Sequence, residues 1–443
     1  MGYKTYPEYR DSGVQWLGEV PAHWETRRLK YAALLRNIKV VAGESHLPYV
    51  GLENIESWSG KYLVQDEAND SEGLSSLFYP GDVLFGKLRP YLAKAFLANF
   101  EGACSSELLV LQGKGVQPEF LVRFVLSVGF IREVDSSTYG TKMPRASWDF
   151  IGNLLVTLPP TEEQTTIAAF LDEKTTQIDQ LIEKKTRFIE LLKEKRAALI
   201  TEAVTGKFDV RTGKPYAEYK DSGVAWLGEI PKDWRMVKLR WLSDIQTGLA
   251  LNNTVDSVDP VGLPYLRVAN VQDGYIDLDE IKVVSVERSK VCQHLLHRGD
   301  VLMNEGGDND KLGRGAVWQG EIDPCIHQNH VFAVRPGREL RPDWLAFVTQ
   351  SHIAKYHFFI HSKQSTNLAS ISSSNIKELP IPLPPPRAQE FIYCSWFKWL
   401  EKMESLMARV QQSIDLLKEK RAALITAAVT GKIDVRNWNT ESA

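Results

Sequence analysis

The sequence lacks the features that mark secreted and membrane proteins. Its four cysteines are scattered at positions 104, 292, 325 and 394, and none forms a CxxC pair. This pattern is typical of a reduced interior. The chain has no run of 18 apolar residues, and its opening MGYKTYPEYR lacks the basic-then-apolar pattern of a signal peptide. We therefore expect a cytoplasmic protein with no membrane partner.

Motifs for catalysis are missing as well. No GxxxxGK[ST] loop for nucleotide hydrolysis occurs, and neither does the NPPY or DPPY tetrapeptide of an adenine methyltransferase. Asp259, Glu280 and Lys282 loosely imitate a nuclease triad, but the stretch VQDGYIDLDEIKVV is more typical of a turn followed by a strand. We expect a chain with no catalytic residues and no bound cofactor.

Two Cys-x-His-x2-His stretches, which begin at Cys292 and Cys325, resemble a metal-ligand box. The first lies in an amphipathic stretch before RGDVL, and the second leads into the strand-like HVFAVR. The matching place in the first half of the chain has nothing similar. We therefore interpret these histidines as core or surface residues and expect no metal; structural zinc is the alternative.

The overall charge gives no sign of a polyanion partner. The chain of 443 residues has 53 basic and 56 acidic side chains and a net charge of −3, so a nucleic-acid surface would have to be a local patch. The apolar share of 43% and the length predict two or three soluble domains, each with a sizeable core.

The chain is a doubled unit. DSGVQWLGEVPAHW (11–24) recurs as DSGVAWLGEIPKDW (221–234), and LLKEKRAALITEAVTGKFDVR (191–211) recurs at 416–436 with nineteen of twenty-one residues identical. Weaker matches between these anchors keep the same order: LPYVGLENI with LPYLRVANV, PGDVLF with RGDVLM, and LPPTEEQ with LPPPRAQ. Joining the end of the chain to its start would continue the repeat, so we expect a circular organisation with neighbouring termini.

Each repeat contains a variable region and a long helix. The variable regions, about 25–155 and 235–380, have short β-branched runs split by Gly, Asp and Asn, which predicts mixed α/β domains. Apolar residues then recur at spacings of three and four in the same register in both copies, which predicts an antiparallel coiled-coil pair. The predicted seam comprises Ile178, Ile182, Ile189, Leu192, Leu199, Met403, Met407, Val410, Ile414, Leu417 and Leu424.

The fold class that follows is α+β, with two α/β domains separated by two long antiparallel helices and a pseudo-twofold circular repeat. We place the first domain with its N-terminal segment at 1–158 and the first helix at 159–211. The second domain follows at 212–383, and the second helix with its tail at 384–443. The repeated segments 11–24 and 221–234 carry Trp24 and Trp234, which suit an anchor between a domain and a helix end.

Basic and amide-rich loops are the remaining candidates for function. They lie in GKLRPYLAK and TYGTKMPRAS of the first domain and in NEGGDNDKLGRG and SKQSTN of the second. Arg and Lys can bind phosphates or guanine, and Asn and Gln can pair with adenine edges. The candidate DNA-binding residues are Lys87, Arg89, Tyr91, Lys94, Tyr139, Thr141, Lys142, Arg145, Asn304, Lys311, Arg314, Lys363, Gln364, Ser365 and Asn367.

These features resemble the specificity subunit of type I restriction-modification enzymes. The resemblance covers essentially the whole chain and is carried by the DSGV-x-WLGE-(V/I)-P segments, the two LPP-x-x-x-Q closings, the helices that end VTGK(F/I)DVR, and NEGGDNDKLGRGAVW. One departure is Ala388, which stands where the closing motif usually has an acid before Gln. It puts only local packing in doubt.

The resemblance implies a non-catalytic, prokaryotic DNA-reading subunit. Each recognition domain would read half of a bipartite, asymmetric site in double-stranded DNA, with half-sites about one helical turn, ~34 Å, apart. The helix pair would set the spacer and dock two methyltransferase subunits, which use S-adenosylmethionine. The family also has restriction subunits that use ATP and magnesium, of which two could join. The alternatives are a modification-only or type II-like system without a separate translocase, and a coiled-coil scaffold with no role on DNA.

Overall fold

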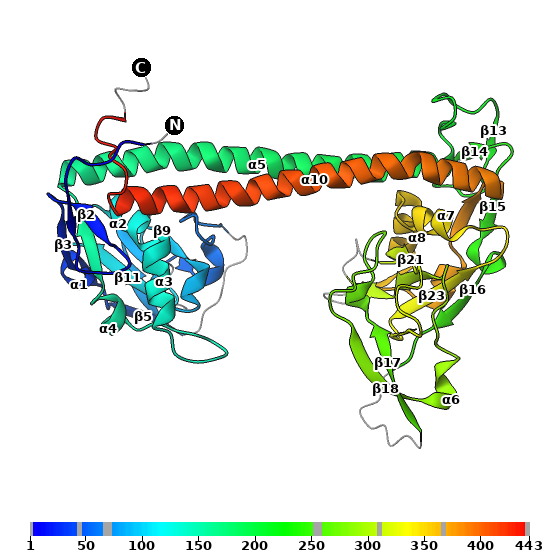
Figure 1. The fold of residues 1–443 in the computed structure, drawn as a ribbon, viewed down its shortest axis with the longest axis horizontal. Coiled ribbons are helices and arrows are strands. Elements are labelled where there is room, and N and C mark those ends of the chain that lie inside the picture. Colours follow the sequence, from blue (N-terminus) through cyan, green and yellow to red (C-terminus); the bar gives the residue numbers. More distant parts are fainter. Residues whose placement is uncertain are drawn as a thin grey trace. The chain divides into compact units, whose positions relative to one another are not determined.

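In the computed structural model, the chain divides into two units. The structure describes residues 3–41, 47–64, 73–250, 259–307, 312–364 and 369–438. Unit 1 comprises Met1–Thr186 and Gln411–Ala443, and unit 2 comprises Arg187–Val410 (Figure 1). Each unit therefore contains one mixed α/β domain and one section of each of two long helices. The predicted fold class is confirmed in these elements.

The two long helices are α5 (Thr161–Thr205) and α10 (Pro386–Val429). Neither has an internal glycine, and α10 has proline only at its first position. Each helix ends just before a glycine in the left-handed region, Gly206 at φ 66° and Gly431 at φ 73°.

The sections of α5 and α10 within each unit run antiparallel. In unit 1, the end of α10 lies beside the start of α5, since the Thr157 hydroxyl donates to the Val429 carbonyl at 2.8 Å. In unit 2, the Phe208 ring just beyond α5 contacts the Trp396 ring near the start of α10, with centroids 5.5 Å apart. All eleven predicted seam residues are buried or half-buried, while most positions between them are exposed.

Unit 1 is built on two four-stranded sheets, in the orders β4-β11-β8-β9 and β5-β7-β10-β6. A two-stranded sheet joins β12 to β3, and the hairpin β1-β2 holds the repeated segment. The strands are β1 (Tyr9–Asp11), β2 (Glu19–Pro21), β3 (Glu25–Arg28), β4 (Ala33–Leu35), β5 (Lys39–Val41), β6 (Tyr49–Val50), β7 (Leu74–Phe78), β8 (Asp82–Gly86), β9 (Ala95–Leu97), β10 (Gly102–Cys104), β11 (Leu108–Gly113) and β12 (Leu155–Leu158). The helices are α1 (Leu29–Ala32), α2 (Pro118–Val125), α3 (Val128–Ser136) and α4 (Trp148–Ile151), with short 3-10 turns η2 (Leu52–Asn54) and η3 (Pro90–Leu92).

Unit 2 repeats this plan with other lengths. Its main sheet has the order β16-β23-β19-β21, beside three-stranded sheets β18-β17-β22 and β20-β25-β24 and the pairs β13-β14 and β15-β26. The strands are β13 (Tyr219–Asp221), β14 (Glu229–Pro231), β15 (Arg235–Lys238), β16 (Ser243–Thr247), β17 (Pro260–Leu266), β18 (Lys282–Glu287), β19 (Val301–Asn304), β20 (Gly306–Gly307), β21 (Gly315–Val317), β22 (Ile326–His327), β23 (Val331–Pro336), β24 (Lys363–Gln364), β25 (Ala369–Ser370) and β26 (Pro380–Leu383). The helices are α6 (Arg288–Val291), α7 (Pro342–Thr349), α8 (His352–His361) and α9 (Ser373–Lys377), with η4 (Leu239–Trp241) and η5 (Val268–Asn270).

The repeated Gly-Asp-Val triplets start the central strands β8 and β19. Asp82 and Asp300 are buried, and each accepts a backbone N–H three residues earlier, from Tyr79 at 2.9 Å and His297 at 2.8 Å. Each carboxylate also pairs with an arginine, Arg36 or Arg335. These hydrogen bonds fix the turn, so the apolar residues that follow enter the core in the same register in both units.

The segments 11–24 and 221–234 anchor their domains to a helix end, as predicted. Trp24 and Trp234 are buried and pack beside the glycine that ends the neighbouring helix, Gly431 and Gly206 respectively. At this joint the Asp434 N–H donates to the Lys4 carbonyl at 2.8 Å, and Asp209 donates to Lys214 at 2.7 Å in the other copy. The first bond joins the two end regions of the chain, which confirms the predicted circular organisation.

Candidate nucleic-acid interface

The two candidate loops of unit 1 lie side by side. The Arg89 N–H donates to the Pro144 carbonyl at 2.8 Å, and the Ala146 N–H donates to the Lys87 carbonyl at 2.9 Å. Tyr91 and Tyr139 are exposed apolar side chains of this surface. The candidate residues of the two loops are Lys87, Arg89, Tyr91, Lys94, Tyr139, Thr141, Lys142 and Arg145, all of which are exposed or half-buried.

Glu107 sets the electrostatics at the centre of this surface. Its carboxylate accepts from Nε of Arg145 at 3.1 Å to each oxygen and also lies 3.0 Å from the Arg145 guanidinium. This hydrogen bonding raises the pKa of Arg145 above its ordinary value. Arg145 stays charged and is held in an ion pair with Glu107, whereas Arg89, Lys142 and Thr141 carry exposed polar groups on the same surface.

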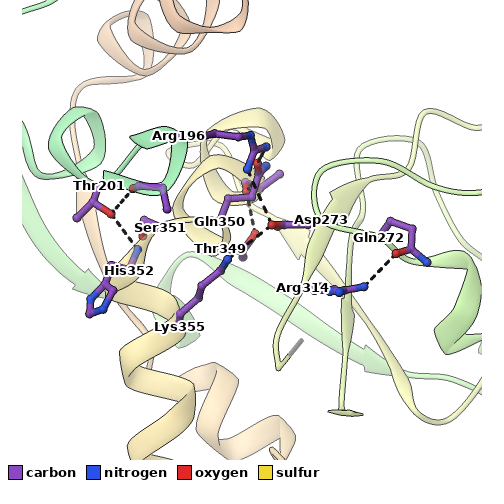
Figure 2. A network of polar contacts seen from close by, with 12 residues as sticks. Arg196, Thr201, Gln272, Asp273, Arg314, Thr349, Gln350, Ser351, His352 and Lys355 are labelled. Atoms are coloured by element: carbon purple, nitrogen blue, oxygen red, sulfur yellow. Dashed lines mark hydrogen bonds and ion pairs between the residues drawn. The ribbon is translucent and has the colours of Figure 1, made fainter. Parts of the chain in front are cut away.

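The two candidate segments of unit 2 also come together. β20 pairs with β25, and β24 with its exposed Lys363 and Gln364 pairs with the other side of β25. Arg314 precedes β21 and donates to the side-chain oxygen of Gln272 at 2.9 Å (Figure 2). Lys311, Ser365 and Asn367 lie outside the described residues.

Asn304 is a correction to the predicted surface. It is buried at 2% exposure, and its amide nitrogen donates to the carbonyls of Val271 at 3.0 Å and Val268 at 3.3 Å. The amide therefore holds the turn after η5 against β19 and is not presented to a base. Asn304 is the last residue of β19, and all four residues of this strand are buried. A residue type that suits base reading therefore lies in the core here.

Equivalent backbone positions frame the surface in the two units. The Ala146 N–H binds the Lys87 carbonyl, and the Ile371 N–H binds the Glu305 carbonyl at 2.8 Å. Ser147 and Ser372 then cap α4 and α9 by accepting a backbone N–H three residues later. The side chains on this common frame differ, with Lys87 in one unit and Glu305 in the other.

The Cys/His stretches belong to the fold. His327 is fully buried, its Nδ1 lies 2.7 Å from the Val331 carbonyl, and burial lowers its pKa to about 4, so the ring is neutral. His330 pairs with Glu305 instead. Within the described ranges no group of three or more His, Cys, Asp or Glu residues is placed to hold a metal ion.

The three residues that imitate a nuclease triad do not converge. Asp259 accepts from Nε of Arg288 at 2.8 Å at one end of the β17-β18 ladder. Lys282 lies opposite Tyr265, which is six positions from Asp259 along the same strand direction, or roughly 20 Å at ~3.3 Å per residue. The arrangement cannot place a metal and a base around one phosphate.

Of the helices that the structure describes, none could cross a membrane.

Sequence reasoning missed the residues that hold each domain on the helices. Arg196 and Arg421 are not among the predicted seam residues, yet Arg421 is buried at 6% exposure and contacts the domain of its unit. Thr201 and Thr426 accept the first N–H of α8 and α3, at 2.9 and 3.0 Å. The available signal was the identical KEKRAALIT in both copies, which contains all four residues.

Known proteins are similar to this chain in sequence and in fold. Residues 26–191 and 231–414 match the family described as the type I restriction modification DNA specificity domain. The MjaVIII specificity subunit of Methanocaldococcus jannaschii is 24% identical over 442 residues, with 95% of each chain covered. The EcoKI specificity subunit of Escherichia coli K12 is 22% identical and covers 77% of this chain and 70% of its own.

Another relative matches over part of its length. The putative MjaX specificity subunit of Methanocaldococcus jannaschii is 25% identical over 207 residues, so that the match spans about half of either chain, 46% of this one and 47% of that one. A solved chain from work on complex assembly and conformational transition of the type I R-M system has the same fold, with a TM-score of 0.67 at 20% identity over 93% of this chain and 98% of its own. The family match covers both halves of the repeat. The chain therefore belongs to the type I restriction-modification specificity subunits.

Proposed function

We propose that the two units are the two readers of a bipartite, asymmetric site in double-stranded DNA. The observation that supports this most is the common backbone frame at residues 87 and 146 and at residues 305 and 371, which carries different side chains in the two units. A shared frame gives both domains the same approach to a groove, and different side chains give different base preferences. Unit 1 would use its exposed Arg89 and Lys142, and unit 2 would use Arg314, Lys363 and Gln364.

The long helices have a second role in this proposal. They would fix the spacer between the half-sites and offer a docking surface for two methyltransferase subunits. The exposed apolar residues of the helices support docking: Leu181 and Leu416 in unit 1, and Leu191 and Leu406 in unit 2. Each residue of one helix has its counterpart 225 positions later, so two copies of one partner could bind in the same way.

The chain itself would supply no catalytic group. S-adenosylmethionine would be bound by the methyltransferase partner, and ATP and magnesium by restriction subunits where these join. The described residues contribute basic loops, which fits a role in recognition.

Selection of DNA by the complete complex tests the proposal. The chain purified with its methyltransferase is mixed with random-sequence duplexes, and the bound fraction is sequenced. The expected result is one enriched motif of two unequal parts separated by unspecified base pairs. A scaffold with no role on DNA would enrich no motif, and that outcome would refute the proposal.

A further inference from the structure

One arginine in each unit, buried Arg421 or half-buried Arg196, links the helix pair to the domain. In unit 1, Arg421 of α10 donates from Nη1 to the Trp58 carbonyl at 2.7 Å and from Nη2 to the Ser59 carbonyl at 3.0 Å. Its Nε donates to Asp179 of α5 at 3.0 Å. The guanidinium therefore joins both helices to the turn that follows η2.

Arg196 of α5 occupies the equivalent position in unit 2 and contacts its domain through side chains. It lies 225 positions before Arg421, and its partner Glu404, at 3.5 Å, lies 225 positions after Asp179. Its guanidinium also binds the Gln350 side chain at 2.5 Å and lies 3.9 Å from Asp273 (Figure 2). Asp273 belongs to the turn after η5.

The two turns correspond. Each turn follows a 3-10 turn and contains a glycine with positive φ, Gly60 at 77° and Gly274 at 94°. A short antiparallel bridge closes each turn, Ile55 with Tyr62 in one unit and Val271 with Ile276 in the other. The helix arginine thus contacts the same structural element in both domains.

The same turns hold a candidate DNA-binding loop from the other side. In unit 1, the Trp58 N–H donates to the Ala93 carbonyl at 2.9 Å, and Lys94 Nζ donates to the Leu52 carbonyl of η2 at 2.6 Å. In unit 2, the Gly274 N–H donates to the Gly315 carbonyl at 3.2 Å, and Arg314 donates to Gln272 at 2.9 Å. Lys94 and Arg314 both stand directly before equivalent strands, β9 and β21.

We propose that Arg421 and Arg196 are positioning residues for DNA reading. Each fixes one turn, and through it the loop that carries Lys94 or Arg314, against the helix section of its own unit. A leucine at this seam position would supply packing, but a guanidinium that donates in several fixed directions also sets the orientation of the domain. The inference rests on the proposed function, because it concerns where the reading loop is held.

The test uses the full complex of this chain with its methyltransferase. Methylation rates are compared on duplexes with the native spacer and with spacers one base pair shorter or longer. Arg421→Ala is expected to raise the relative rate on the altered spacers about tenfold, which corresponds to about 1.4 kcal/mol of lost discrimination. Arg196→Ala is expected to have the same effect through the other domain, and Lys420→Ala, at an exposed neighbouring position, is the matched control.

The readout separates positioning from folding. A residue that only stabilised the fold would lower the melting temperature while folded molecules kept the native spacer preference. Arg421→Lys keeps the charge without the planar guanidinium and is expected to relax spacer preference by a smaller factor. If Arg421→Ala does not fold, Arg421→Lys takes its place in the comparison. An unchanged spacer preference in the folded variants would overturn the inference. Failure of the proposed function is distinct, because the wild-type complex would then prefer no site at all.

Discussion

The Thr426 hydroxyl of α10 accepts a hydrogen bond of 3.0 Å from the Val128 N–H, the first of α3. In the other unit, Thr201 of α5 accepts from the His352 N–H, the first of α8, at 2.9 Å. A side chain of a long helix thus satisfies an amide that has no partner within its own short helix. Thr201 and Thr426 are counterparts in the repeat, so the same bond fixes both domains.

Thr426→Val should loosen α3 and leave α8 unchanged. Loss of a cap of this kind costs about 1 kcal/mol, so exchange of the α3 amides through local opening should accelerate about fivefold. Hydrogen exchange read by mass spectrometry measures both helices in one experiment. Thr165→Val is the control, because the Thr165 hydroxyl donates to the Thr161 carbonyl of its own helix. Equal exchange in α3 of wild type and Thr426→Val would contradict the expectation.

Glu163→Ala should release the N-terminal segment. Glu163 is buried, accepts from the Tyr6 hydroxyl, and lies 2.9 Å from Nε2 of His23. Its removal leaves buried polar groups unpaired, at a cost of about 1–3 kcal/mol. Limited proteolysis should cut residues 3–24 faster in this variant than in the exposed control Glu162→Ala. The counterpart of Glu163 in unit 2 is Ala388. In unit 2 the repeated segment follows directly after α5 in the chain, so a covalent connection holds it at the helix end. Proteolysis equal to that of the control would show that Glu163 is dispensable in unit 1 as well.

Unit 2 should lose stability as the pH falls from about 7 to about 4. The pKa of His327 is about 4 in the folded protein because of burial, against 6.5 for the ordinary side chain. The unfolded chain therefore takes up a proton in this window that the folded chain refuses, which costs up to about 3 kcal/mol below pH 4.

The His327→Asn variant isolates this effect. Urea unfolding is monitored through hydrogen exchange of the β23 amides at pH 7 and at pH 4.5. Between these pH values the variant should lose less stability than the wild type. The difference between the two proteins removes the contribution of the carboxyl groups, which titrate in both. Parallel pH profiles would contradict the assignment of the effect to His327.

Arg314→Ala should weaken discrimination in one half-site only. If its guanidinium contacts a base, the loss is about 1–3 kcal/mol at one position of the half-site read by unit 2. Binding of the complex to duplexes with single-base changes measures this loss, with Arg338→Ala, exposed in the same unit but outside the loops, as the control. A loss that is uniform over all sequences would instead identify a phosphate contact.

The long helices and their anchor segments could be predicted because short stretches of sequence encode them, and each stretch occurs twice. The spacing from Ile178 to Leu199 predicts a helix with one apolar face, and the repeat of Trp24 at Trp234 predicts an anchor at each helix end. Gly206 and Gly431 mark the ends of the helices through their backbone preference. These signals depend on neighbours in sequence, so no knowledge of tertiary contacts was needed.

The interface could be predicted only in part, because its side chains are assigned by long-range contacts. Asn304 has a residue type suited to DNA, but the packing of η5 buries it. Arg145 suggests a free positive charge in the sequence, yet an ion pair with Glu107 from a distant loop balances that charge. A basic residue in a helix seam suggests a side chain that reaches solvent, and nothing local indicates that Arg421 turns inward to the carbonyls of Trp58 and Ser59.

The most direct test of two readers on a helical spacer is the mapping of methylated adenines in cells. The wild-type chain is expressed with its methyltransferase, beside a variant with seven residues inserted at both Thr186 and Val410. Seven residues preserve the seam register and lengthen each helix by ~10 Å, close to three base pairs at ~3.4 Å each. We expect an asymmetric two-part motif in the wild type and the same half-sites with a longer spacer in the variant. Altered half-sites with an unchanged spacer would contradict two readers held apart by the helix pair.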